Sequence, residues 1–253
     1  MSRAVPAGYV RLEVGRATAV ARAELAETVR DALLVGTLHA YAGRHPERRT
    51  LQGRGVAYAA PLPRGAGRVV VRHNHHGGIF ARVTGDRFLI PTRAPHELET
   101  SLSLAARGVP TPQIVAYALY PAGPLLRRAD IASREVPDAR DAEAALAAAR
   151  SAGDVDEVLE ATARLVAALT RAGARHHDFN LKNVLLARDA SGGLTAYVLD
   201  VDRVEFLQPA DPRVTELNLR RLTRSVRKWM RRGLAGLTEE RIDLFHRRVR
   251  ALG

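Results

Sequence analysis

One segment of the sequence combines residue types and spacing that suit catalysis. Asp178 lies two residues after His176, and Asn183 follows it five residues later. This order matches the H-x-D-x-x-x-x-N pattern of phosphoryl-transfer loops, with His177 in place of the usual arginine. In such a loop the aspartate accepts a hydrogen bond from the attacking hydroxyl, and the asparagine oxygen reaches a magnesium ion that bridges the phosphates. The segment therefore predicts that Asp178 and Asn183 act in Mg²⁺-dependent phosphoryl transfer.

A second carboxylate for the same metal is expected at the end of the next strand. Asp200 occupies that position, because it ends the apolar run YVLD. Taken singly, the loop and Asp200 are explained as well by a polar turn and a strand end. Their order, however, favours phosphoryl transfer. A helix that ends at Gly173 is followed by the loop, a strand, a turn and a second strand whose last apolar residue precedes Asp200. We interpret His176 as a structural residue that supports the loop.

The segments around the loop predict the elements that hold it. From residue 154 to Gly173 apolar residues recur at helical spacing, with Asp154 as the expected N-cap and Gly173 at the end. The stripe consists of Val155, Val158, Leu159, Thr162, Leu165, Val166 and Leu169. After the loop, the runs NVLLA and AYVLDV, joined by DASGG, predict a tight pair of strands. The last 40 residues are expected to be helical and basic.

The first half of the chain has a β-rich texture. Between residues 51 and 90, β-branched and aromatic runs alternate with Gly and Pro, which predicts an antiparallel sheet. Residues 95–108 predict a helix with Leu98, Leu102 and Ala105 on one face and Gly108 at its C-cap. Before the sheet, residues 19–40 predict an amphipathic helix or a mixture of strand and helix; after the helix, residues 109–120 predict another strand. We place a boundary near residue 135, with an N-lobe over residues 1–135 and an α-rich C-lobe over residues 136–253.

Composition narrows the classes of partner. The 253 residues include 39 basic and 27 acidic side chains, a net charge of +12, which predicts an anionic partner such as a nucleotide, nucleic acid or acidic lipid. The chain has no cysteine, which excludes disulfides, thiolate metal sites and cysteine nucleophiles. We see no signal peptide and no apolar run of membrane-spanning length, so we expect a cytoplasmic protein that at most sits on a membrane.

Several motifs together resemble one known family. They are GRGVAYAA, VVVRHNHHGGIFARVTGDRFL, HELETSLSLAARGVPTPQIVAY, HHDFNLKNVLL, VLDVDRVEF and NLRRLTRSVRKW, and they span residues of about 50 to 230. The sequence is similar to the lipopolysaccharide kinases, most closely the 3-deoxy-D-manno-octulosonic acid (Kdo) kinases. The resemblance implies an α+β, protein-kinase-like bilobal fold that uses ATP and Mg²⁺. It also implies a Kdo hydroxyl on lipid A as the acceptor, met at the inner face of the inner membrane.

The resemblance also implies nucleotide-binding positions. Gly53 and Gly55 would begin the loop that covers the phosphates, although Tyr58 replaces the third glycine of the usual pattern. A Walker A loop is excluded, because neither lysine of the chain follows a glycine. The segment 133–137 stands where a kinase hinge would run, with the backbone of Glu135 and Val136 facing adenine.

Arg72 would replace the strand lysine that binds phosphate in kinases. No lysine precedes Lys182, so that lysine cannot be present. Arginine keeps the positive charge and can pair bidentately with a carboxylate. Its partner on the following helix would be Glu97, with Glu99 as the second choice.

The acceptor site is assigned to basic and polar side chains. We expect His73, Arg82, Arg87 and Lys182 to meet an acidic sugar or lipid A phosphates, with solvated surface charge as the simpler alternative for each. The three histidines between residues 73 and 76 are interpreted as a polar loop and not as a metal site.

A basic helix is predicted at residues 217–230. Leu219, Leu222, Val226, Trp229 and Met230 share one side, and arginines cover most of the rest. Such a helix could dock on an anionic membrane surface. We favour the interpretation that the stripe packs on the C-lobe core, with arginines that still attract acidic lipid.

Two other functions are compatible with parts of the sequence. A phosphotransferase for another small-molecule or core-sugar hydroxyl would share the catalytic loop. A cationic aminoglycoside is a poor acceptor for a +12 protein. A non-catalytic kinase-like basic binding module would keep only the charge; the retained Asp178, Asn183 and Asp200 argue against it. The low aromatic content of 5% makes nucleic acid an unexpected partner.

Overall fold

The chain forms two compact units. The computed structural model describes residues 4–52, 55–73, 88–89, 92–123, 126–233 and 236–253. One unit comprises residues 1–99 and 113–135, and the other comprises residues 100–112 and 136–253. Residues 100–112 thus belong with the second unit, whereas the sequence analysis assigned all of residues 1–135 to the first. The division into separate lobes after residue 135 stays a prediction.

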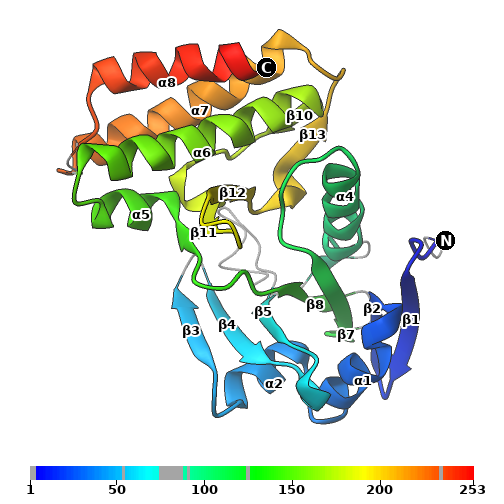
Figure 1. The fold of residues 1–253 in the computed structure, drawn as a ribbon. Coiled ribbons are helices and arrows are strands. Elements are labelled where there is room, and N and C mark those ends of the chain that lie inside the picture. The colour runs from blue at the N-terminus through cyan, green and yellow to red at the C-terminus, as the bar shows by residue number, and fades with distance from the viewer. Residues whose placement is uncertain (1–3, 53–54, 74–87, 90–91, 124–125, 234–235) are drawn as a thin grey trace. The chain divides into compact units, whose positions relative to one another are not determined.

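An antiparallel sheet dominates the first unit (Figure 1). Its strands are β1 (Tyr9–Val14), β2 (Ala17–Arg22), β3 (Arg49–Gln52), β4 (Val56–Pro61), β5 (Arg68–His73), β6 (Phe88–Leu89), β7 (Ile114–Pro121) and β8 (Leu126–Arg134). The order is β1-β2-β7-β8-β5-β4-β3, with β6 paired to β8, and every neighbouring pair is antiparallel. The antiparallel sheet predicted for residues 51–90 is confirmed in the described part of that stretch.

Short helices cover part of this sheet. They are η1 (Ala23–Leu25), α1 (Ala26–Leu34), α2 (Leu38–Arg44) and η2 (Pro63–Gly65). Val29 and Leu38 from these helices are buried with Val69 and Val71 of β5 in one apolar core. Residues 19–40 are therefore the predicted mixture of strand and helix.

The helix α4 (Ala94–Ala106) ends as predicted but turns a different face inward. Gly108 follows it with a φ of +72°, a conformation that glycine adopts without strain. The buried residues Leu98, Ser101 and Leu104 lie three apart, whereas Ala105 is exposed. The predicted face of Leu98, Leu102 and Ala105 is therefore wrong beyond its first residue. The prediction chose Ala105 because it is apolar. In the helix, Ser101 shares the buried face with Leu98 and Leu104, although serine is polar.

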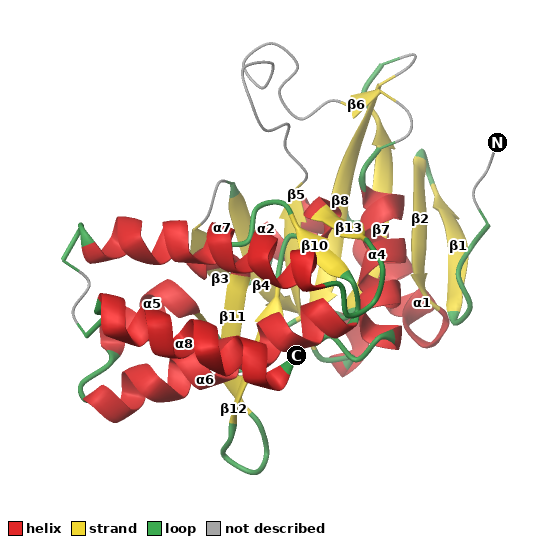
Figure 2. Cartoon of the chain, turned by 90° about the horizontal axis from the view of Figure 1, so that it is seen from above, coloured by secondary structure: helices red, strands yellow, loops and turns green. Residues whose placement is uncertain are grey.

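The second unit is mainly helical (Figure 2). Its helices are α5 (Ala142–Ala148), α6 (Ala152–Arg171), η3 (Leu181–Asn183), η4 (Val201–Arg203), α7 (Pro212–Met230) and α8 (Glu239–Leu252). Its strands are β9 (Arg140–Asp141), β10 (Ala174–His176), β11 (Val184–Arg188), β12 (Leu194–Val198) and β13 (Val204–Phe206). Strands β9, β11 and β12 form one small antiparallel sheet, and β10 and β13 form another. The predicted strand pair of NVLLA and AYVLDV is confirmed as β11 and β12.

The central helix α6 confirms its predicted stripe and corrects its predicted start. The stripe residues Val155, Leu165 and Leu169 are buried in the core of the unit. The N-cap is Ser151, whose hydroxyl accepts from the N–H of Asp154, while the Asp154 carboxylate accepts from the N–H of Ser151. The prediction of Asp154 as N-cap is therefore wrong, because this aspartate forms the second half of a capping box three residues later.

The helix α7 packs its apolar stripe inward, as the favoured interpretation expected. Leu219, Leu222 and Val226 are buried in the same core as α6 and α8. Trp229 and Met230 are partly buried against that core. In the part of the chain that the structure describes, no helix combines the length and apolar character needed to cross a membrane.

Candidate active site

A buried histidine organises the predicted catalytic loop. His176, at the end of β10, is 1% exposed. Its Nδ1 accepts a hydrogen bond from the N–H of Asp178 at 3.1 Å, so the ring proton lies on Nε2, which donates to the carbonyl of Leu199 at 2.9 Å. Burial lowers the pKa of His176 below its usual 6.5, which favours this neutral form. The histidine therefore ties the segment that carries Asp178 to the segment that carries Asp200.

Asn183 closes the same loop from its other end. The side chain is 7% exposed, and its Nδ2 donates to the carbonyl of Asp178 at 2.8 Å. Its own carbonyl accepts from the N–H of Leu199 at 2.9 Å. Since Nδ2 is used inside the loop, the carboxamide oxygen is the atom left to act as a ligand. We call His176, Asp178, Asn183 and Leu199 the His176 network.

Asp200 directly follows this network in an unusual backbone conformation. Its φ is +53° and its ψ is 47°, the left-handed region that side chains with a Cβ rarely adopt. Aspartate tolerates this region better than most residues, and such conformations gather at functional sites. The hydrogen bond to Leu199 and the charges of Asp200, Asp178 and Asp202 act to raise the pKa of His176, against the larger effect of burial.

Two residues of α7 hold the loop, and the sequence analysis missed both. Asn218 is fully buried; its Oδ1 accepts from the N–H of His176 at 2.9 Å, and its Nδ2 donates to the carbonyl of Ala174 at 3.0 Å. Ser225 accepts from the N–H of Leu181 through Oγ at 3.3 Å. Asn218 lies four residues before Leu222 and thus on the apolar stripe predicted for this helix. A polar residue at such a position is expected to be buried and hydrogen-bonded, and this signal could have found Asn218.

In the first unit, Arg72 forms an ion pair with Glu97. Arg72 lies on β5, and Glu97 lies in the first turn of α4 with its side chain 5% exposed. Of the two predicted partners, the structure therefore brings Glu97 to Arg72. A carboxylate this deeply buried needs such a cation to offset its lost hydration.

In the predicted hinge, the N–H and the carboxylate of Glu135 already have partners within the first unit. The N–H of Glu135 donates to the carbonyl of Arg68 at 3.1 Å. Its carboxylate pairs with Arg49 and Arg68. Of the backbone groups of Glu135, the carbonyl is thus the one left to face an adenine. Val136 is the next residue, and its predicted backbone role stays a prediction.

The remaining predicted positions have different outcomes. His73 lies with Nδ1 2.5 Å from the carboxylate of Asp130, which is fully buried, and this contact competes with a role in substrate binding. Gly55 precedes β4, which contains Tyr58. Lys182 is exposed, with Nζ 3.7 Å from the carboxylate of Glu143. Gly53, Arg82 and Arg87 lie outside the described residues.

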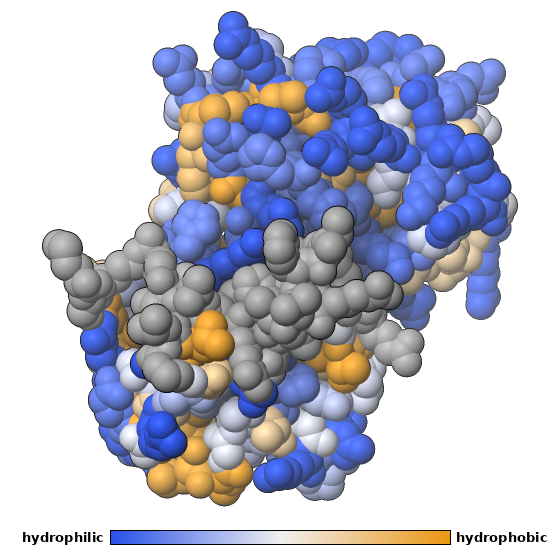
Figure 3. Space-filling view, turned by 180° about the vertical axis from the view of Figure 1, so that it is seen from behind, coloured by the Kyte–Doolittle hydropathy of each residue, from blue (hydrophilic) through white to orange (hydrophobic). Residues whose placement is uncertain are grey.

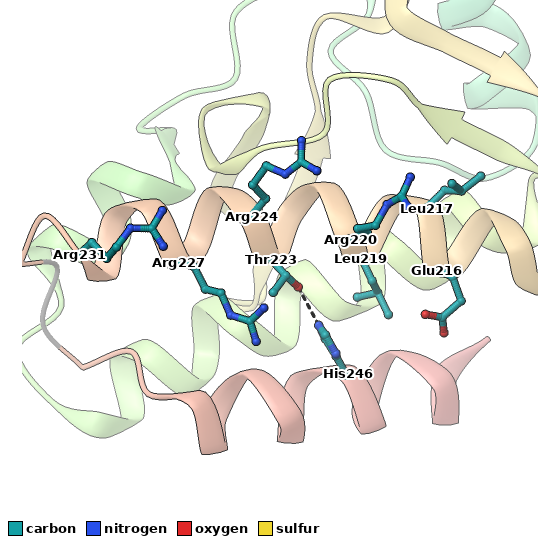
Figure 4. Close-up of a pocket in the computed structure, with 9 residues that line it drawn as sticks. All are labelled: Glu216, Leu217, Leu219, Arg220, Thr223, Arg224, Arg227, Arg231 and His246. Atoms are coloured by element: carbon teal, nitrogen blue, oxygen red, sulfur yellow. Dashed lines mark hydrogen bonds between the residues drawn. The ribbon is translucent and has the colours of Figure 1, made fainter.

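A groove lies between α7 and α8 (Figure 4). It encloses about 520 Å³ and is lined by Glu216, Leu217, Leu219, Arg220, Thr223, Arg224, Arg227, Arg231 and His246. Figure 4 shows Thr223 and Arg227 pointing toward α8, and Thr223 hydrogen-bonds His246 at 2.8 Å. None of the residues predicted to act in phosphoryl transfer lines it.

The side-chain oxygens of Asn183 and Asp200 suit a hard cation. Within the described ranges, no cluster of three His, Asp or Glu side chains could hold a metal ion by itself. Magnesium in phosphotransferases is commonly held by one or two side-chain oxygens together with substrate phosphates. The carboxamide oxygen of Asn183 and the carboxylate of Asp200 fit that requirement.

The fold and the site together define a kinase-like phosphotransferase. A β-rich unit carries the ion pair of Arg72 and Glu97, and a helical unit carries the H-x-D-x-x-x-x-N loop followed by a strand pair and Asp200. The α+β, protein-kinase-like fold predicted from the sequence is thereby confirmed.

Comparison with known proteins identifies the family. Residues 47–247 match the model of the lipopolysaccharide kinase (Kdo/WaaP) family. A 3-deoxy-D-manno-octulosonic acid kinase of Stenotrophomonas maltophilia is 34% identical over 181 residues, which are 70% of this chain and 68% of that protein. The protein of the same name from Xanthomonas oryzae pv. oryzae is 36% identical over the same shares. The chain belongs to the lipopolysaccharide kinase family, and it is an ATP-using phosphotransferase that acts on a sugar hydroxyl.

A solved structure was also found. It is titled WaaP in complex with acyl carrier protein, and it aligns with 88% of this chain and 96% of its own chain at 16% identity, with a TM-score of 0.48.

Proposed function

We propose that this chain transfers the γ-phosphoryl group of ATP to a hydroxyl of a Kdo residue attached to lipid A. The observation that carries the proposal is the His176 network, which holds the backbone of Asp178 and Asn183 beside Asp200. The relatives that are more than 30% identical are named for the same sugar. The net charge of +12 also suits an acceptor rich in phosphate and carboxylate groups.

In this proposal Asp178 acts on the acceptor hydroxyl. Its carboxylate accepts the hydroxyl hydrogen bond and takes the proton as the acceptor oxygen bonds to phosphorus, while the bond from the γ-phosphorus to the bridging oxygen breaks and ADP leaves. Asn180 donates to the Asp178 carboxylate from Nδ2 at 3.3 Å, which orients the side chain. His176 fixes the backbone of the same residue and takes no part in proton transfer.

Asn183 and Asp200 would hold magnesium through their side-chain oxygens. When bound, the ion supplies positive charge that offsets the charge of the phosphates. Because Nδ2 of Asn183 is engaged by the carbonyl of Asp178, the carboxamide is oriented before any ion arrives. This preorganisation favours binding, since less side-chain freedom is lost.

The nucleotide would use residues of the first unit. Arg72, oriented by Glu97, would contact phosphate oxygens. Gly53 and Gly55 would bring backbone amides close to the phosphates, and the carbonyl of Glu135 with the N–H of Val136 would pair with adenine. Acceptor contacts from His73, Arg82, Arg87 and Lys182 are part of the same proposal.

We further propose that the protein works at the cytoplasmic face of the inner membrane, as a peripheral protein. A lipid A acceptor is anchored there, and α7 carries arginines that suit acidic headgroups. Within the described residues, Arg220, Arg224 and Arg231 form no ion pair. Figure 3 shows that hydrophilic side chains cover most of the visible surface of the helical unit.

The test is phosphate transfer from labelled ATP, with magnesium, to Kdo-bearing lipid A, with lipid A lacking Kdo as the control acceptor. The wild type should label the first lipid and not the second. Asp178→Ala should label neither, while Asp156→Ala, which removes an exposed carboxylate of α6, should behave as the wild type. Labelling that does not depend on Kdo would overturn the proposed acceptor, and labelling by Asp178→Ala would overturn the proposed role of this residue.

A further inference from the structure

Three cationic side chains surround the chain's one tryptophan. The distances to the ring centroid of Trp229 are 4.9 Å from Cζ of Arg232, 5.8 Å from Nζ of Lys182 and 6.0 Å from Nζ of Lys228. Lys182 and Lys228 are the two lysines of the whole sequence, which otherwise uses arginine. We call these four residues the Trp229 cluster.

The Trp229 cluster is attached to the catalytic loop. Ser225, which accepts from the N–H of Leu181, lies four residues before Trp229 and therefore on the same face of α7. Lys182, the next residue of the loop, donates its own N–H to Oδ1 of Asn180 at 3.0 Å, and Nδ2 of Asn180 donates to Asp178. A short chain of contacts thus joins the cluster to the proposed catalytic aspartate.

The charges of the cluster are not balanced inside the protein. Lys182 has one carboxylate nearby, Glu143, at 3.7 Å. Among the residues for which side chains are described, Lys228 and Arg232 form no ion pair. Three cations and one carboxylate leave an excess of positive charge around a single aromatic ring, and an anion bound among these cations would offset their mutual repulsion.

Glu143 is itself poorly satisfied. Its Oε2 is buried without a hydrogen-bond partner among the described residues, and burial raises the pKa of this carboxyl. Because Nζ of Lys182 lies 3.7 Å from this oxygen, beyond hydrogen-bond distance, the ion pair leaves the N–H donors of Lys182 available to another acceptor. The site is therefore left to be completed by an anionic group from outside the chain.

We infer that the Trp229 cluster binds the carboxylate and ring of the acceptor sugar, and so selects an acidic sugar over a neutral one. This inference rests on the proposed function, because it names the part of the acceptor that the enzyme recognises. Arg232 and the two lysines meet the carboxylate, since arginine and lysine form charge-assisted hydrogen bonds with it. The indole of Trp229 offers a flat apolar surface to the sugar ring. Asp178 and Lys182 belong to the same loop and are linked through Asn180, so the loop that acts on the hydroxyl also contributes to this recognition.

The first experiment measures binding without catalysis. Because Trp229 is the single tryptophan, its fluorescence reports directly on the cluster. Kdo should change the emission of the wild type, and the neutral methyl ester of Kdo should require about tenfold more sugar or more for the same change. Arg232→Gln and Lys228→Gln should weaken Kdo binding by a similar factor and leave the response to the ester unchanged. Arg213→Gln, an exposed arginine at the other end of α7, is the matched control. Equal affinity for Kdo and its ester would overturn the inference.

The second experiment separates this inference from the proposed function. With Kdo-bearing lipid A as acceptor, Arg232→Gln should raise the KM for the acceptor about tenfold and leave the KM for ATP unchanged. Trp229→Phe, which retains an apolar ring against the core, should raise the same KM by a smaller factor. If the wild type phosphorylates the lipid and these variants match it, the inference is overturned and the proposed function stands. If Kdo binds at Trp229 but is not phosphorylated, the proposed function fails and the binding site stands.

Discussion

The two units hold their polar groups in contrasting ways. In the first unit, Arg72 is held by a direct ion pair with Glu97, one partner from a strand and the other from a helix. In the second unit, the backbone around Asp178 and Asp200 is held by His176, which accepts from the N–H of Asp178 and donates to the carbonyl of Leu199, the residue before Asp200. The Arg72 side chain is thus held by an opposite charge, whereas the segments that carry Asp178 and Asp200 are held through hydrogen bonds to their main chain.

This difference predicts how each unit responds to mutation. Removing Arg72 leaves Glu97 as a buried carboxylate, and removing Glu97 takes away one carboxylate partner of Arg72, but the strand and helix that carry them remain. Removing the backbone contacts of the His176 network displaces two functional segments at once. The first unit should therefore fail in nucleotide affinity, and the second in turnover and stability.

Asp178→Asn should give the largest effect. The carboxylate accepts the acceptor's proton, whereas the backbone of Asp178 makes the contacts to His176 and Asn183, so the loop should survive the change. We expect kcat to fall by about 10³-fold with little change in the KM for ATP. Steady-state phosphate transfer measures both constants. A loss of less than tenfold would contradict the assignment of Asp178 as the base.

Gly173→Ala should strongly destabilise the second unit. Gly173 has a φ of +68°, and an added Cβ would lie 2.4 Å from the carbonyl oxygen of Leu207. We expect urea unfolding to show a loss of about 3 kcal/mol. Gly192→Ala is the matched control, because φ is +83° but no atom lies within 4 Å of the added Cβ. It should lose only about 1 kcal/mol, the cost of the backbone conformation alone. Equal losses at the two sites would show that the contact with Leu207 does not matter.

Arg72→Ala should raise the KM for ATP by about tenfold, because a charged contact to phosphate is lost. Glu97→Gln should have a smaller effect in the same direction, and the double variant should be no worse than Arg72→Ala. Arg30→Ala, which removes an exposed partner of Glu27 on α1, provides the control. An unchanged dependence on ATP in Arg72→Ala would exclude a nucleotide role for the pair.

The smallest effect concerns pH and stability. Burial lowers the pKa of His176 in the folded protein, so below about pH 6.5 the unfolded chain binds a proton that the folded chain resists. Stability should therefore fall as the pH falls from 6.5, with a slope of at most about 1.4 kcal/mol per pH unit for one proton. His246 contributes in the same direction, because burial lowers its pKa as well. His176→Gln should reduce the slope measured by unfolding at several pH values, and His246→Gln should remove a separate part of it. A slope that His176→Gln leaves unchanged would show that folding does not lower the pKa of this histidine.

Local patterns in the sequence predicted much of the fold. The stripe of α6, the strand pair of β11 and β12, the antiparallel sheet and the inward packing of α7 all depend on the period at which apolar residues recur. The order of Asp178, Asn183 and Asp200 was also readable, because a loop between a helix and a strand pair restricts its residues to a short stretch of chain. Their roles in catalysis stay predictions.

Contacts between distant residues were decided by the tertiary structure. The sequence could not show that Asn218 would hold His176, or that the N–H of Glu135 would donate to the carbonyl of Arg68. The sequence offered Glu97 and Glu99 as partners of Arg72. Only the folded structure shows that Glu97 of α4 is the one that pairs with Arg72 of β5. The Trp229 cluster also arises in this way, because Lys182 and Trp229 lie far apart in sequence. By itself, the sequence determined which elements form and which chemistry they could carry, since both depend on local spacing. The pairing of polar groups depends on how those elements pack against one another, and only the tertiary structure decides it.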